Sequence, residues 1–129
     1  MKDDLRRRIE ERWWSLWRMI GAPVIWSLHF LFCYVYAAVR CAKGGPLQPL
    51  DDVRTVIAAV TLLALLIVGA SGYSAWRHTR IEGDPAPHDE STLEDRHRFL
   101  AMAELLLAGL SFVAILYTAI PAFIFPDCR

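Results

Sequence analysis

Long uncharged stretches alternate with short charged segments along the chain. Three stretches contain no Asp, Glu, Lys or Arg: residues 19–39, 55–76 and 105–126, with lengths of 21, 22 and 22 residues. A helix rises about 1.5 Å per residue, so about 20 residues cross the roughly 30 Å hydrocarbon core of a bilayer. The pattern therefore predicts three transmembrane helices. Their expected bounds are 19–40, 54–76 and 99–124.

A helical pattern of a different kind precedes the first span. Between residues 3 and 20, apolar side chains recur every three or four positions, and charged side chains occupy other parts of the helical wheel. Such an amphipathic helix is expected to lie along a membrane surface. Because Pro23 lacks the N–H of a continuous helix, either one long helix bent at Pro23 or two separate helices would fit. The apolar positions are Leu5, Ile9, Trp13, Leu16 and Ile20.

Together these elements predict an all-α integral membrane fold in a single domain. Three transmembrane helices form a small bundle, preceded by an N-terminal amphipathic interfacial helix. Ser91 followed by Glu94 is typical of a capping box, so the third helix is expected to begin before it enters the lipid. The segments outside the spans are 1–18, 41–53, 77–98 and 125–129.

The basic side chains are unequally divided between the two sides of the predicted membrane. Ten of the 14 Lys and Arg residues lie in the N-terminal segment or the second connection, against four in the first connection and the tail. The positive-inside rule then predicts a bacterial inner-membrane protein with a cytoplasmic N-terminus and an external C-terminus. The first uncharged run exceeds the core of about 7 to 15 residues in a signal peptide, so we expect an uncleaved anchor. A cytoplasmic aromatic belt would comprise Trp13, Trp14, Trp17 and Trp76.

The composition agrees with a location in lipid. Apolar residues make up 55% of the chain and the mean hydropathy is +0.30, which argues against a soluble enzyme domain, a zinc finger and a disordered tail. The formal net charge is zero, so no nucleic-acid partner is expected. The sequence contains no Walker loop, dinucleotide-binding turn, nucleophile elbow or CxxC pair. We therefore expect a protein that is not an enzyme.

His29 stands at the centre of the first span, where a titratable side chain is costly and usually faces a partner or a cavity. Counting from the span centres places Ser111 level with His29 and Thr61 about one turn away, which predicts an intramembrane polar layer. Three roles stay open for His29. It could be a packing histidine, a ligand of haem or metal assisted by Cys33, or a group in a proton pathway. The spans hold no second histidine, so a bis-histidine haem would need another copy of the chain or another protein.

Glu104 is a second candidate site. If it lies inside the bundle, its depth matches Gly21 and Ala22 on the first span and Ser71 and Gly72 on the second. Ser71 and Gly72 belong to a run of small residues that favours close helix packing. An internal glutamate could carry protons or bind a cation, although a pore would require oligomers. A glutamate that reaches the cytoplasmic surface fits the sequence equally well.

The three cysteines differ in position. Cys41 and Cys128 both follow the external ends of their helices, and the first and third helices are parallel, so their ends can be neighbours. The external compartment is oxidising and permits a disulfide between them, with two free thiols as the alternative. Cys33 lies within the first span and is expected to stay reduced.

Several short motifs are spread over residues 17–128. They are Ala22 with Pro23, Trp26, His29 with Phe30, Tyr34, Cys41, Pro87 to Asp89, Glu94 to Arg96, Arg98 with Phe99, and Cys128. In combination they resemble a group of small, uncharacterised bacterial inner-membrane proteins that are often encoded near cytochrome c oxidase genes. The resemblance implies a respiratory context and supplies no catalytic residue.

The favoured hypothesis is an interaction protein, namely an accessory or assembly subunit of a larger membrane complex. The resemblance suggests a respiratory oxidase of the haem–copper type as that complex. Three short spans leave little enclosed volume for a substrate, which favours this class over an enzyme. The alternatives are a haem- or metal-binding redox protein that uses His29, and an oligomeric proton or ion conduit that uses Glu104. The expected partners are the bilayer and the larger complex, and a homo-oligomer is also possible.

Overall fold

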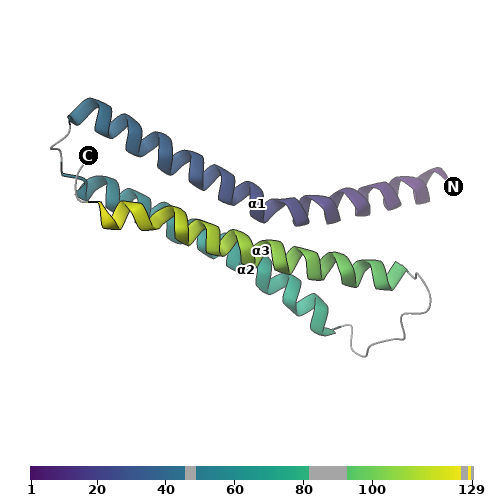
Figure 1. Cartoon of the computed structure of the whole chain (residues 1–129). Coiled ribbons are helices and arrows are strands. Elements are labelled where there is room, and N and C mark those ends of the chain that lie inside the picture. The colour runs from purple at the N-terminus through teal and green to yellow at the C-terminus, as the bar shows by residue number, and fades with distance from the viewer. Residues whose placement is uncertain (46–48, 82–92, 126–127, 129) are drawn as a thin grey trace.

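The computed structural model describes residues 1–45, 49–81, 93–125 and 128. Over these residues the chain forms three helices and no strand: α1 (Lys2–Gly44), α2 (Asp51–Ile81) and α3 (Leu93–Ile124) (Figure 1). Each helix contains a stretch that is long and apolar enough to cross a membrane. The predicted all-α class and the number of long apolar helices are therefore confirmed. The predicted capping residue Ser91 lies outside the described residues.

The amphipathic segment and the first span form one continuous helix of 43 residues. At about 1.5 Å per residue, α1 is about 64 Å long, roughly twice the thickness of the hydrocarbon core. Pro23 lies inside this helix, and Figure 1 shows α1 bent part-way along its length. A proline in a helix removes one backbone hydrogen bond and bends the axis without ending the helix. Of the two expected arrangements, the single bent helix is the one observed.

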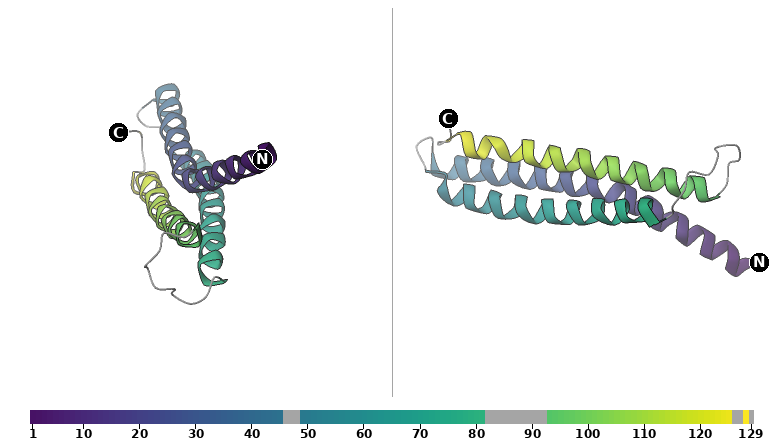
Figure 2. Two further views of the ribbon diagram at one scale, coloured as in Figure 1. Left: turned by 90° about the vertical axis from the view of Figure 1, so that its right-hand side faces the viewer. Right: turned by 90° about the horizontal axis from the view of Figure 1, so that it is seen from below.

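The three helices lie side by side, and their packing is uneven (Figure 2). The α2–α3 pair has the most extensive contact, whereas α1 contacts α3 less and α2 least. The end of α1, the start of α2 and the end of α3 meet at one end of the bundle, called here the disulfide end (Figure 1). Residues 2–18 of α1, called here the arm, extend away from the other two helices (Figure 2).

Small side chains allow α2 and α3 to approach closely. A Cβ atom added at Gly72 would lie 3.3 Å from the Cβ of Ala108, which is closer than ordinary van der Waals contact. At Gly69, one turn away, an added Cβ would meet nothing within 4 Å. Gly72 is therefore the position in this small-residue run where the missing side chain permits the approach.

The interior of the bundle is made mainly of small residues. One buried cluster contains Ala22, Ala64, Val68, Ala108 and Ile115, and Trp26 packs against it. Most of the large apolar side chains are instead exposed on the outer surfaces of the helices. An apolar exterior of this extent would be unfavourable in water, and it suits helices that are surrounded by lipid.

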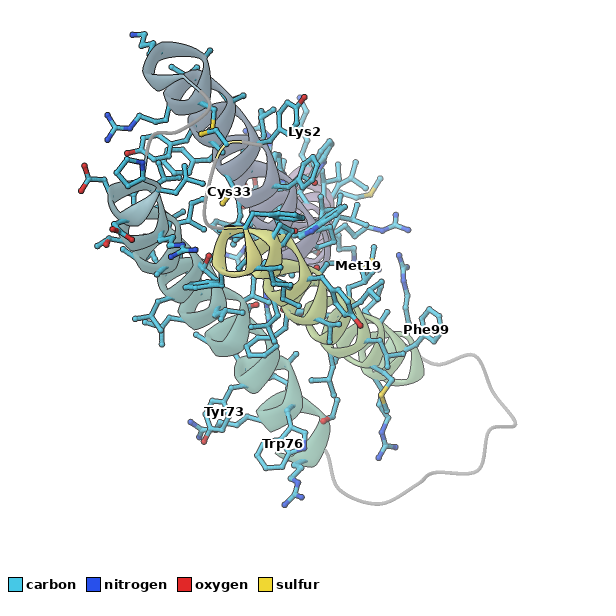
Figure 3. All side chains as sticks on the ribbon, turned by 60° about the vertical axis from the view of Figure 1, so that its left-hand side comes forward. Lys2, Met19, Cys33, Tyr73, Trp76 and Phe99 are labelled. Atoms are coloured by element: carbon cyan, nitrogen blue, oxygen red, sulfur yellow. A yellow bond between two sulfur atoms is a disulfide. The ribbon has the colours of Figure 1, made fainter. Side chains whose placement is uncertain are left out.

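Aromatic and basic side chains lie together at the far end of α2 from the disulfide. Tyr73 and Trp76 project outward in Figure 3, with ring centroids 6.0 Å apart. The guanidinium of Arg80 stacks over the Trp76 ring at 4.2 Å. Stacked aromatic and basic side chains of this kind suit a membrane–water interface. Trp13, Trp14 and Trp17 are exposed on α1.

Candidate functional site: polar groups inside the helix bundle

His29 lies in the interior and is 3% exposed. Its Nε2 atom lies 2.9 Å from Thr61 Oγ1, so a hydrogen bond joins α1 to α2 at mid-bundle. Cys33, one helical turn along α1, places its Sγ atom 3.5 Å from the same nitrogen. Whether Nε2 donates or accepts depends on the tautomer of the imidazole.

This arrangement favours a hydrogen-bonding histidine over a ligand. Nε2 is already engaged by Thr61 and Cys33, whereas the buried Nδ1 has no hydrogen-bond partner among the described residues. Among those residues, no three His, Cys, Asp or Glu side chains gather in a way that could hold a metal ion. Binding of haem or metal through Nε2 would require the bond to Thr61 to break.

Ser111 is buried on α3. Within the described part of the chain no hydrogen bond joins it to His29 or Thr61, so the structure brings two members of the expected polar layer together and leaves the third without this contact. Trp26 contributes another buried polar atom, Nε1, which has no hydrogen-bond partner among the described residues. The interior is therefore polar at several points without forming one connected network.

Glu104 is 8% exposed, so the structure places its side chain inside the bundle. Arg18 of α1 pairs with it: Arg18 Nη2 lies 3.4 Å from Glu104 Oε2 and 3.5 Å from Oε1. Ser71, the expected neighbour, instead donates its hydroxyl to the Val68 carbonyl of its own helix at 2.8 Å. The Glu104 site is therefore an ion pair between α1 and α3, located where the arm joins the bundle.

The spacing of residues in the sequence contains a signal for this ion pair. Glu104 was expected at the depth of Gly21 and Ala22, and Ala22 faces the core. Arg18 precedes Ala22 by four residues, so the two share one face of a helix. Arg18 was counted only as a charge that sets orientation, and its role as a partner was missed.

The predicted disulfide is present at the opposite end of the bundle. The Sγ atoms of Cys41 and Cys128 are 1.99 Å apart and the Cα atoms 5.5 Å apart, so the bond links the end of α1 to the segment after α3. Cys33 is free and buried, as expected. Near the disulfide, Arg40 pairs with Asp52 at 3.4 Å, which links the end of α1 to the start of α2.

Arg54 of α2 has a role that sequence analysis missed. Its Nε donates to the Ala122 carbonyl at 3.1 Å and its Nη2 donates to the Phe125 carbonyl at 3.2 Å. The last carbonyls of a helix have no partner within that helix, and a cation there also interacts favourably with the helix dipole. Arg54 therefore caps α3 from a neighbouring helix. Its Nη1 also lies 3.7 Å from Asp51 Oδ1.

A cavity of about 450 Å³ lies between the three helices next to the disulfide. α1 contributes small side chains to its wall, including Cys33, Ala37 and Ala38. Arg54 is the one charged side chain among the described residues that line it, and most of the remaining wall is apolar. His29 is not part of the lining.

The sequence matches no protein-family model, no curated protein and no solved structure. The resemblance to small inner-membrane proteins associated with oxidase genes therefore stays a prediction. Functional inference for this chain depends on its own residues and geometry.

Proposed function

We propose that this chain is a non-enzymatic interaction protein of the bacterial inner membrane, with a cytoplasmic N-terminus and an external C-terminus. The observation that supports this proposal most directly is the arm of α1. Its 17 residues extend the helix by about 25 Å. Its apolar stripe of Leu5, Ile9, Trp13 and Leu16 is between 45% and 61% exposed.

An exposed stripe with large aromatic and aliphatic side chains is suited to packing against another helix or a protein groove. The Arg18–Glu104 pair holds the base of the arm against α3, so the direction of the arm is coupled to the bundle. In the cell, the arm would present this stripe at the cytoplasmic face of the membrane. The partner we propose is a larger membrane complex of the haem–copper oxidase type, as the sequence resemblance suggests.

Site-specific photo-crosslinking in native membranes tests this proposal. A photoreactive phenylalanine at Trp13 lies on the stripe, whereas the same residue at Arg7 lies on the opposite face of the arm and serves as the control. We expect a protein adduct from position 13, identified by mass spectrometry as an oxidase subunit, and little adduct from position 7. Exclusive crosslinking of position 13 to lipid would mean that the arm is only the interfacial helix expected from the sequence, and it would contradict the proposed protein contact.

A redox function through His29 is the first alternative. A haem or metal ligand needs one ring nitrogen that is free to face the cofactor. Nε2 is engaged by Thr61 at 2.9 Å, and Nδ1 is buried inside the bundle. We expect the purified protein to be colourless and His29→Ala to lower stability modestly. A Soret band in the absorption spectrum that disappears in His29→Ala would instead favour the redox function.

A proton or ion conduit through Glu104 is the second alternative. Arg18 neutralises the carboxylate at 3.4 Å, which weakens any attraction of Glu104 for a cation. The Ser71 hydroxyl donates to the Val68 carbonyl of its own helix at 2.8 Å, and no hydrogen bond joins it to Glu104 among the described residues. Proton flux into liposomes containing the protein, compared with Glu104→Gln, measures this activity directly, and equal flux is the expected result.

A further inference from the structure

At the disulfide end, a space between the helices is not filled by side chains, although many of the residues around it are small. Small residues on facing helices normally permit close approach, as Gly72 and Ala108 do between α2 and α3. On the cavity wall, Ala37 and Ala38 of α1 and Ala122 of α3 are similarly small, yet about 450 Å³ stays between the helices. The helices are nevertheless in contact beside the cavity, because Cys33 of α1 packs with Val53 and Ile57 of α2 in one buried cluster.

Two links hold the end of α1 beside this cavity. The disulfide joins Cys41 to Cys128, and Arg40 pairs with Asp52 at 3.4 Å. Both links lie beside the cavity at one end of α1, while the contact between α1 and α2 is the least extensive of the three helix pairs. The helices are therefore joined next to the cavity by one covalent bond and one ion pair.

An apolar space of this size is unfavourable when empty, because the atoms of its wall lose van der Waals contacts. Water would find few polar partners on a wall that is mostly apolar. In a bilayer the surrounding solvent is hydrocarbon, and a flexible hydrocarbon chain can fill the space between helices. The chemistry of the wall therefore favours a lipid chain as the occupant.

The charged side chain in the lining indicates which headgroup the lipid chain carries. Arg54 is the one charged group among the described lining residues, and it stands at the predicted membrane interface, at the start of the second span. A guanidinium has five N–H donors. The carbonyls of Ala122 and Phe125 accept from two of them, and Nη1 lies 3.7 Å from the carboxylate of Asp51. The Asp51 side chain is 85% exposed, so solvent screens this ion pair and Arg54 can still attract a second anion. Arginine is well suited to bind phosphate, because its planar N–H groups match the arrangement of the phosphate oxygens.

We propose that this cavity binds one phospholipid. Its acyl chain lies between α1 and the α2–α3 pair, and Arg54 binds its phosphate. This lipid acts as part of the packing of the bundle, filling the space beside the disulfide and the Arg40–Asp52 pair.

Native mass spectrometry of the full-length protein in detergent, delipidated and then supplied with dipalmitoyl phosphatidylglycerol, tests the site. Ala38→Phe adds a large side chain at the cavity wall, at an exposed position, so folding should be preserved. Ala59→Phe makes the same change at an exposed position of α2 outside the lining and serves as the control. We expect one lipid on the unaltered protein and on Ala59→Phe, and about tenfold weaker retention on Ala38→Phe, equivalent to displacing about two methylene groups.

The headgroup is tested with dipalmitoyl glycerol, which has the same chains and no phosphate. Loss of a charge-assisted hydrogen bond should weaken retention by about tenfold. Equal retention of both lipids would overturn the role of Arg54, and displacement of phosphatidylglycerol by a quinone would overturn the choice of occupant.

Equal lipid binding by Ala38→Phe and Ala59→Phe would mean that the lipid is not in the cavity. If Ala38→Phe fails to form the disulfide, Ala38→Val provides a smaller change, and undiminished binding by that folded variant overturns the proposal.

Discussion

Replacing Arg18 with alanine tests how strongly the ion pair with Glu104 stabilises the bundle. Glu104 is 8% exposed, so its carboxylate would stay largely desolvated without a partner. Breaking a fully buried ion pair in this way costs about 3 to 5 kcal/mol. The Arg18 side chain is 45% exposed, so solvent screens part of the interaction. We therefore expect the free energy of unfolding to fall by about 1 to 3 kcal/mol in Arg18→Ala.

Removing the acidic partner should give a different result. In Glu104→Met the half-exposed Arg18 guanidinium can turn toward water or lipid phosphate, so its desolvation penalty is small. The methionine suits an apolar interior. The double variant Arg18→Ala/Glu104→Met leaves no unpaired carboxylate, and we expect it to be more stable than Arg18→Ala alone.

Unfolding by SDS in mixed micelles, followed by circular dichroism, measures these differences. Arg12→Ala is the matched control, because Arg12 is exposed on the arm and its loss should change stability by no more than about 0.5 kcal/mol. Equal midpoints for Arg18→Ala and Arg12→Ala would refute the reasoning. A double variant that is no more stable than Arg18→Ala would refute it as well.

Three further measurements test other parts of the structure. Maleimide labelling of denatured protein should find one thiol without reduction and three after it, and three without reduction would exclude the disulfide. Gly72→Leu should separate α2 from α3 and cost about 1 to 3 kcal/mol, whereas Gly69→Leu, which meets open space, should be nearly neutral. Alkaline phosphatase should be active when fused after Arg129 and inactive after Arg80, and the opposite result would reverse the proposed orientation.

The number of long apolar helices could be predicted because lipid imposes a strict requirement on length and charge. A run of 21 or 22 uncharged residues has few alternative structures. The first two runs lie within α1 and α2, and α3 covers residues 105–124 of the third. The Cys41–Cys128 bond followed from the same pattern, since two helices that run in the same direction bring their ends together. Both inferences depend on where the helices begin and end along the chain.

The polar contacts could be predicted only in part, because they depend on how each helix is rotated and how far it slides against its neighbours. Depth alone placed His29 near Thr61, and the hydrogen bond is present. Depth did not decide whether Ser111 shares that bond or which cation meets Glu104. A few ångströms of sliding or a modest rotation of a helix would change these partners, and the periodicity of a single sequence does not fix either quantity.

The capping of α3 by Arg54 makes two helices dependent on each other. The guanidinium that completes the end of α3 belongs to the first turn of α2, so the position at which α3 can stop depends on the register of α2. A chimaera that replaces α3 alone, or lengthens it by one turn, would leave its terminal carbonyls without these donors. A chimaera should therefore fold well only when α2 and α3 are transferred together as one unit.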